Sequence, residues 1–313
     1  MKRLAVWLIL SFMPLSGGAA MPDLYSRSAI VYGTGEGRIL LEKHADEVAP
    51  IASLTKLMTA MVVLDQRPAL DEPLTIAPAD VDLVKHSRSR LPVGATLARG
   101  EMLRLALMAS ENRSASALSR AALVGGKPAF VARMNTKASA LGMHRTRFED
   151  PTGLSPRNVS SARDLLTMAD AAAHYTLIRE FTTLSSDSID IARRSLRYRN
   201  TVGLVREPEW GIQLSKTGFI NEAGHCIVIK ANLGSGPVII VLLGAASNRK
   251  RSADLNAIRN WLEGKALTGA MLQAAYPAKR IPHHRAKALV RRGDVSHAHY
   301  SKRHALQVRR TGG

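Results

Sequence analysis

Three short strings of residues that could take part in catalysis follow one another along the chain: Ser53-Leu-Thr-Lys56, Ser110-Glu-Asn112 and Lys216-Thr-Gly218. In the first string a hydroxyl and an amine lie three positions apart at a predicted helix start, which places both side chains on one face. A serine hydroxyl is a weak nucleophile until a base takes its proton. Lys56 can be that base only if burial or a nearby positive charge lowers its pKa. The first string therefore indicates an acyl-transfer nucleophile with a lysine base.

The other two strings could supply the rest of such a site. Ser110 could pass a proton to a leaving amine, and the Asn112 amide could hold a substrate carbonyl. Lys216 lies on an apolar strand face, where a charge is costly unless it has a function or a partner. It could anchor a substrate carboxylate, and Gly218 would let the substrate approach the strand backbone.

Each string also has an ordinary structural explanation. A Ser-x-x-Lys spacing is expected about once by chance in a chain of this length, and Ser247-Asn-Arg-Lys250 matches it as well. We expect that second copy to lie in a charged loop after a strand, and we interpret it as a chance match. Ser110-Glu-Asn112 would also suit a helix end, and Lys216-Thr-Gly218 a strand that runs into a glycine turn. The order of the three strings therefore carries more weight than any one of them.

The intervening sequence predicts the elements that would position these residues. Apolar residues at helical spacing predict a helix with one apolar face over residues 53–64. Strict alternation places Lys216 on the same strand face as Leu214 and Ile212. Further helices are predicted at 102–107, 116–123, 128–141, 162–173 and 254–262. Strands are predicted at 28–32, 38–41, 210–214, 226–229 and 238–243, with hairpin turns at 33–37 and 232–236. This order predicts an α/β fold, in which an antiparallel sheet built from both chain ends carries an inserted helical subdomain.

The two ends of the chain differ from the middle. Lys2 and Arg3, an apolar run to residue 15 and small residues up to Ala20 have the layout of a secretory signal peptide. We predict cleavage after Ala20 and a periplasmic location, with an uncleaved anchor as the alternative. Residues 277–313 carry ten Lys or Arg residues and one acid, and therefore nine of the net charge of +19. The prediction is a signal peptide over 1–20, a catalytic domain over 21–264 and a basic, disordered tail over 265–313.

The composition bounds the chemistry and the partners. Cys226 is the only cysteine, so no internal disulfide can form, and we expect it to pack as a small apolar residue. The histidines outside the tail suggest no metal-ligand set, and no cofactor or metal is predicted. The tail could bind an anionic polymer or a membrane surface. Export makes nucleic acid an unexpected partner.

Taken together, the three strings resemble those of the penicillin-binding proteins and serine β-lactamases. Ile51-Ala-Ser-Leu-Thr-Lys-Leu-Met-Thr-Ala-Met61, Leu107-Met-Ala-Ser-Glu-Asn-Arg113 and Leu214-Ser-Lys-Thr-Gly218 are similar to the low-molecular-mass D-alanyl-D-alanine peptidases. Within that family, the best likeness is to endopeptidases of the penicillin-binding protein 7 type, through Asp150-Pro-Thr-Gly-Leu154, Gly224-His-Cys226 and the Ser110-Glu-Asn112 variant. The resemblance covers roughly residues 25–263 and implies the β-lactamase/D,D-peptidase-like α/β fold.

The resemblance also implies roles for individual residues. Ser53 would be the acyl-ester nucleophile, Lys56 its proton acceptor, and Ser110 with Asn112 the second motif. The backbone N–H groups of Ser53 and Phe219 would form the oxyanion hole. The substrate-binding residues would be Asn112, Lys216, Thr217, Gly218 and Phe219, with Arg251 as a weaker match to an arginine that binds a terminal carboxylate.

The activity implied is hydrolysis of D-alanyl cross-links in peptidoglycan through an acyl-enzyme, with β-lactam antibiotics as covalent inhibitors. A D-alanyl-D-alanine carboxypeptidase is the first alternative. Such enzymes carry a second, β-rich domain and a membrane-surface helix, for which the sequence after Leu262 is too short or lacks an apolar face. A β-lactamase is disfavoured because no Glu-x-x-Leu-Asn string lies between the second and third motifs. A non-catalytic wall-peptide-binding protein would have no physical need of Lys56.

Overall fold

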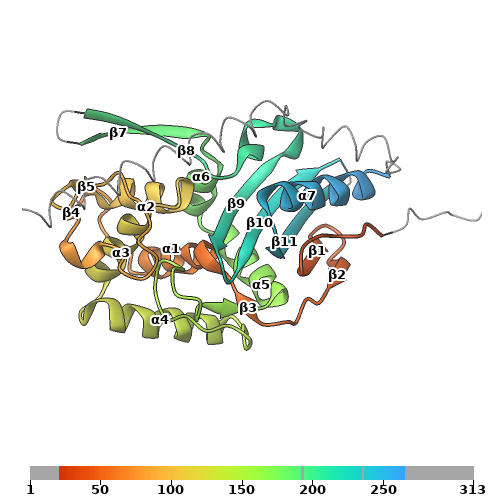
Figure 1. Cartoon of the computed structure of the whole chain (residues 1–313), viewed down its shortest axis with the longest axis horizontal. Helices are drawn as coiled ribbons and strands as arrows, with labels where there is room; N and C mark the ends of the chain where they lie inside the picture. Colours follow the sequence, from red (N-terminus) through yellow and green to blue (C-terminus); the bar gives the residue numbers. More distant parts are fainter. Residues whose placement is uncertain (1–20, 192–193, 235, 265–313) are drawn as a thin grey trace, which may run out of the picture. The chain divides into compact units, whose positions relative to one another are not determined.

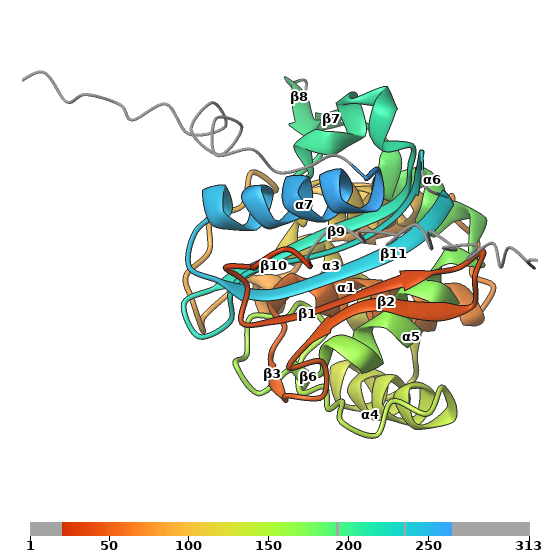
Figure 2. The same cartoon turned by 90° about the vertical axis from the view of Figure 1, so that its right-hand side faces the viewer.

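The computed structural model of the protein describes residues 21–191, 194–234 and 236–264. Its central feature is one antiparallel sheet in the order β2-β1-β11-β10-β9 (Figures 1 and 2). The first and last parts of the catalytic chain meet in this sheet, because Ile30 of β1 pairs with Val241 of β11. The prediction of a sheet built from both chain ends is therefore confirmed. The strands are β1 (Ser28–Gly33), β2 (Arg38–Lys43), β9 (Ile212–Ile220), β10 (Gly224–Leu233) and β11 (Gly236–Ala245). The predicted signal peptide and basic tail lie outside the described residues.

Both faces of the sheet are covered, which explains the continuous apolar runs at 226–229 in β10 and 238–243 in β11. Successive side chains of a strand point to opposite faces. In β10, Val228 belongs to the larger core under the helices, and Ile227 and Ile229 belong to the smaller core on the other face. Helix α7 (Asn248–Leu262) covers that second face, and α5 (Ala162–Ala173) packs on the first (Figure 2).

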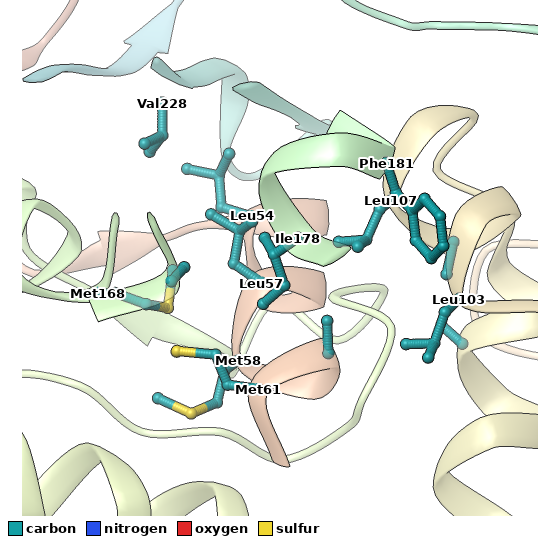
Figure 3. Close-up of a cluster of buried hydrophobic side chains, with 14 of the residues drawn as sticks. Leu54, Leu57, Met58, Met61, Leu103, Leu107, Met168, Ile178, Phe181 and Val228 are labelled. Atoms are coloured by element: carbon teal, nitrogen blue, oxygen red, sulfur yellow. The ribbon is translucent and has the colours of Figure 1, made fainter. Parts of the chain in front are cut away.

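The inserted segment consists mainly of helices that surround α1 (Thr55–Asp65). Residues 55–63 of α1 are all buried, whereas the sequence predicted a helix with one apolar face. The prediction of a one-sided helix was wrong because α2 to α6 pack around α1 and leave it no solvent-facing side. Figure 3 shows Leu57 and Met61 of α1 close to side chains from α2, α5 and α6. The other helices of the insertion are α2 (Arg99–Met108), α3 (Asn112–Ala122), α4 (Gly126–Ala140) and α6 (Thr176–Thr183).

Short elements connect these helices. A two-stranded hairpin of β7 and β8 follows α6 and extends past α2 (Figure 1), to which the Arg104–Asp187 ion pair ties it. Neither this hairpin nor α6 was predicted from the sequence. The remaining elements are β3 (Ala49–Pro50), η1 (Ala52–Leu54), β4 (Pro73–Thr75), η2 (Pro78–Asp80), β5 (Thr96–Ala98), β6 (Val159–Ser160), β7 (Ser186–Ile191), β8 (Arg194–Arg199), η3 (Gly203–Arg206) and η4 (Pro208–Trp210). No helix within the described ranges is long and apolar enough to span a lipid bilayer.

Two local predictions need correction. The alternation of β9 is interrupted by a register shift, because Lys230 pairs with Leu214 and Ala231 pairs with Ile212. Leu214 therefore lies in the larger core whereas Ile212 packs against the smaller one, and only Leu214 shares a face with Lys216.

The second correction concerns Ser247, which was expected in a charged loop. Its hydroxyl accepts a hydrogen bond from the backbone N–H of Lys250 and caps the first turn of α7. That turn is rich in charged residues and carries no apolar periodicity, so the sequence predicted the helix to begin only at residue 254.

Candidate active site

The three strings meet at one cleft, although they lie up to 163 positions apart in the numbering. Ser53 comes from η1, Ser110 and Asn112 from the junction of α2 and α3, and Thr217 from the edge strand β9. Lys56 and Lys216 are buried beneath the cleft. Their amines contact the hydroxyls of Ser53 and Ser110, respectively. The cleft has a volume of about 380 Å³ and is lined by Ser53, Ser110, Asn112, Thr201, Thr217, Gly218, Phe219, His225, Asn248 and Arg251.

The amine of Lys56 has three oxygen neighbours. Its Nζ lies 2.9 Å from the Ser53 Oγ, 2.7 Å from the Asn112 Oδ1 and 2.7 Å from the backbone oxygen of Thr152. The last two oxygens belong to an amide and a peptide group and can only accept hydrogen bonds, whereas a hydroxyl can also donate one. A neutral amine that donates to both carbonyl-type oxygens therefore directs its lone pair at the Ser53 hydroxyl. This is the arrangement in which an amine can take a proton from a serine.

Burial makes the neutral form of Lys56 accessible. The side chain is 1% exposed, and burial lowers its pKa to about 8, against the opposing effects of the Asp150, Glu111 and Asp82 carboxylates. Desolvation is the main cause of this shift. The charges of Lys56 and Lys216 also repel each other, which disfavours the state in which both amines are protonated.

Lys216 and Ser110 form the second pair of the site. The Nζ of Lys216 donates to the Ser110 Oγ at 2.9 Å and to the backbone oxygen of Thr217 at 3.0 Å. Burial lowers the pKa of Lys216 well below its usual value, and the charges of Lys56 and Arg251 lower it further. A substrate carboxylate in the cleft would favour the protonated form of Lys216. Lys216 is therefore not a permanent cation, because its charge depends on what occupies the cleft.

The backbone at Ser110 is held in an uncommon conformation. Ser110 has a φ of 59°, in the left-handed region that non-glycine residues rarely adopt. It lies between the end of α2 and the start of α3, where the N–H of Glu111 bonds back to the oxygen of Leu105. Strained residues of this kind persist where the surrounding structure fixes them, often at functional sites. Here the turn brings the hydroxyl of Ser110 into the cleft, next to Lys216.

Two glycines allow other segments to pack directly on the backbone of η1. A Cβ on Gly153 would overlap the oxygen of Ala52, and a Cβ on Gly218 would lie 2.8 Å from the oxygen of Ile51. The close approach of β9 to this backbone is therefore a second reason for glycine at position 218, beside the predicted room for substrate. Gly218 also lines the cleft, but its missing side chain is what lets β9 approach Ser53.

Sequence reasoning gave no role to three residues that position the predicted site residues: Asp150, Thr152 and Ser87. The turn that presents the oxygen of Thr152 is organised by the Asp150 carboxylate, which accepts hydrogen bonds from the backbone N–H groups of Thr152, Gly153 and Ser155. The Nδ2 of Asn112 donates to the Ser87 Oγ at 2.8 Å, which leaves one amide hydrogen for a substrate carbonyl. Asp150 and Thr152 belong to the string Asp150-Pro-Thr-Gly-Leu154, which resembles the family, whereas nothing in the sequence pointed to Ser87.

The rim of the cleft carries the remaining predicted residues. Phe219 is 53% exposed, and its ring stacks on His225 with centroids 4.4 Å apart. Thr217 donates to the hydroxyl of Thr201 at 2.7 Å. Arg251 is 7% exposed and donates to the backbone oxygen of Cys226 at 3.3 Å. All of the predicted site residues therefore lie in the cleft or directly beneath it.

Cys226 itself is buried in the larger core, as predicted, and burial raises its pKa to about 11. Within the described ranges, no group of three or more His, Cys, Asp or Glu side chains could hold a metal ion.

A buried amine that faces a serine hydroxyl, with a second serine and amine beside it, defines the site of a serine acyl-transfer enzyme with a lysine base.

Comparison with known proteins shows the family of the chain. Residues 16–247 match the D-alanyl-D-alanine carboxypeptidase family, so the chain belongs to that family of serine D,D-peptidases, and the resemblance seen in the motifs is confirmed. The chain is 43% identical to a D-alanyl-D-alanine endopeptidase of Pseudomonas aeruginosa, over 88% of this chain and 89% of that protein. It is 40% identical to a D-alanyl-D-alanine endopeptidase of Escherichia coli, over 86% of each.

A solved structure agrees with the fold. The Streptomyces K15 DD-transpeptidase is similar with a TM-score of 0.72 and 30% sequence identity, and the likeness covers 78% of this chain and 99% of that one. The predicted D,D-peptidase-like α/β fold is therefore confirmed.

Proposed function

We propose that this protein is a serine D,D-endopeptidase that hydrolyses D-alanyl cross-links between peptidoglycan stem peptides through an acyl-enzyme on Ser53. The observation that carries the proposal is the 2.9 Å contact between the Lys56 Nζ and the Ser53 Oγ, made by an amine whose pKa is lowered to about 8 by burial. The endopeptidase preference is supported by the relatives of Pseudomonas aeruginosa, Escherichia coli and Haemophilus influenzae, which all carry that name.

The first half of the reaction forms the ester. Neutral Lys56 takes the proton of Ser53, and the serine oxygen attacks the D-alanyl carbonyl carbon. The backbone N–H groups of Ser53 and Phe219 stabilise the tetrahedral oxyanion, at about 3 kcal/mol for each donor. The carbon–nitrogen bond then breaks, and Ser110 gives its proton to the departing amine. Lys216, which donates to Ser110 at 2.9 Å, replaces that proton.

The second half releases the product. Water attacks the ester carbonyl and passes a proton through Ser110 to Lys216, which is neutral after the first half. The bond to Ser53 breaks and protonated Lys56 returns a proton to the serine oxygen, so both lysines regain their starting states. Asn112 and Thr217 hold the donor peptide, and Gly218 lets it lie along the edge of β9. Arg251, a buried cation, favours a carboxylate on the leaving side, and Lys216 does so when it is protonated.

β-Lactams would form a slowly cleared ester on Ser53, because the glutamate string that some β-lactamases use to activate water is missing between the second and third motifs. A D-alanyl-D-alanine carboxypeptidase is the second candidate, favoured by the description of the matching family. A wall-peptide-binding protein without activity is disfavoured, since binding alone gives no reason for the amine at Ser53.

Mass spectrometry of purified cross-linked muropeptides tests the proposal. We expect dimers to be converted to monomers by the wild-type protein and not by Ser53→Ala. Loss of a terminal D-alanine from pentapeptides with intact dimers would identify a carboxypeptidase instead.

The proposed location is the periplasm, with peptidoglycan as the main partner. The basic residues of 277–313 suggest a second contact with an anionic polymer or membrane surface. Co-sedimentation with anionic phospholipid vesicles is expected for the full chain and not after removal of 277–313. Equal binding by both forms would rule the tail out as the anchor.

A further inference from the structure

The active-site cleft continues past Arg251 into a second cavity. This cavity lies between η3 and α7, has a volume of about 290 Å³ and shares Thr201, Asn248 and Arg251 with the cleft. Its size is near the lower end of the range of about 300–1,000 Å³ found for ligand pockets. We call it the α7 cavity. Because Arg251 lines both spaces, a ligand held at Arg251 can extend into either.

The lining of the α7 cavity has an apolar part, a polar part and one charged side chain, the exposed carboxylate of Glu207. Its apolar part contains the buried side chains of Val202, Ile227 and Leu255. Its polar part is an exposed row on one face of α7, formed by residues four positions apart: Asn248, Ser252 and Asn256. Apolar side chains suit methylene groups, and the amides and hydroxyl of the row suit peptide N–H and C=O groups. A ligand with methylenes next to peptide groups fits this lining.

Arg251 is a buried cation with unused hydrogen-bonding capacity. It is 7% exposed, and its Nη1 donates to the backbone oxygen of Cys226 at 3.3 Å. Its Nε is buried and has no hydrogen-bond partner in the part of the chain that the structure describes. A buried charge of this kind is costly unless a ligand or partner compensates it. A carboxylate at the junction of the two cavities would do so.

We infer that the α7 cavity binds the leaving stem peptide of the cross-link, on the far side of the scissile amide. The inference rests on the proposed endopeptidase function. In a D-alanyl cross-link to a diamino dicarboxylic acid such as diaminopimelic acid, the carbon attached to the scissile nitrogen carries both a carboxylate and a methylene chain that leads to the second stem. With the carboxylate at Arg251, that side chain begins where the two cavities join.

The same geometry distinguishes two substrates. A terminal D-alanine carries only a methyl group at this position and has no use for the α7 cavity. Filling the cavity should therefore impair cleavage of cross-links and spare reactions whose leaving group is small or absent. Penicillin acylation of Ser53 and release of a terminal D-alanine are two such reactions.

Asn256→Trp tests this inference, because residue 256 lines the α7 cavity and not the catalytic cleft. Asn260→Trp is the matched control, one turn further along α7 and outside both cavities. Three rates are measured for each protein: cleavage of purified muropeptide dimers, release of D-alanine from a monomeric pentapeptide, and acylation by fluorescent penicillin. For Asn256→Trp we expect kcat/KM on dimers to fall by at least about tenfold, with the other two rates within about twofold of wild type.

Each other outcome counts against the inference. Dimer cleavage by Asn256→Trp at the wild-type rate would show that the leaving stem does not use the α7 cavity, while the proposed function would stand. An equal loss in Asn260→Trp would mean that any bulky residue on α7 has the effect. A parallel loss of penicillin acylation would place the effect at Ser53. Wild-type protein that leaves dimers intact would overturn the proposed function itself.

Discussion

The burial of Lys56 predicts how acylation depends on pH. Burial lowers the pKa of this amine to about 8, and only its neutral form can take the proton of Ser53. With that pKa, roughly a tenth of Lys56 is neutral at pH 7 and roughly nine-tenths at pH 9. The second-order rate constant for acylation by penicillin should therefore rise about tenfold between these pH values and then level off.

Quenched-flow mixing with fluorescent penicillin at constant ionic strength gives this profile, with circular dichroism to verify that the fold is kept at each pH. A rate constant that stays flat or falls from pH 7 to pH 9 would contradict the assignment of Lys56 as base.

A charge-removing variant sharpens the test. The Glu111 carboxylate raises the pKa of Lys56 and accepts a hydrogen bond from the backbone N–H of Arg113 at 3.1 Å, a bond that a glutamine oxygen can also accept. Glu111→Gln should therefore move the midpoint of the profile to lower pH and leave the plateau unchanged. Glu36→Gln, in the exposed β1–β2 turn, is the control that should not move it. A midpoint that moves to higher pH in Glu111→Gln would refute the reasoning.

Three further predictions concern single residues. Lys56→Arg should fold but show no acylation by penicillin on a denaturing gel, because a guanidinium cannot act as the base; covalent labelling would contradict this. Ser110→Ala should lower kcat for muropeptide dimers by about 10²–10⁴-fold, the usual contribution of a general acid, and a change under about threefold would exclude that role. Gly153→Ala should lower the free energy of unfolding by at least about 3 kcal/mol, because its Cβ would overlap the oxygen of Ala52. Gly142→Ala, which has a positive φ but open space around its Cβ, should cost only about 1–2 kcal/mol in urea denaturation.

The sequence predicted the parts of the site that are local along the chain. Ser53 and Lys56 lie within one turn, so their contact follows from helical spacing alone. The five strands of the sheet were recognisable because β-branched residues and glycine turns are local signals. The meeting of Ser53 with Ser110 and Lys216 was inferred from order and resemblance, since no local signal specifies a contact across such separations.

The features that were missed depend on tertiary structure. The Thr152 oxygen that holds Lys56 comes from 96 positions along the chain, and a backbone carbonyl leaves no trace in residue type. The register shift in β9 moved Ile212 to the other core, and Gly211, which directly precedes Ile212 and has a φ of 49°, is the one local signal beside it. The pKa values of Lys56 and Lys216 depend on how deeply tertiary packing buries each amine, which the sequence does not reveal. The α7 cavity likewise depends on tertiary structure, because its lining residues come from η3, β10 and α7.

Peptide mapping of the penicillin adduct tests the central claim most directly. Trypsin should release Ser53 within residues 44–56, a peptide with a single serine, because Lys43 precedes it and Lys56 ends it. After incubation with penicillin, mass spectrometry should find the adduct on this peptide, at Ser53, and none in Lys56→Arg. An adduct on Ser110 or on Ser247, or no adduct at all in the folded wild-type protein, would contradict the assignment of Ser53 as the acyl-forming nucleophile.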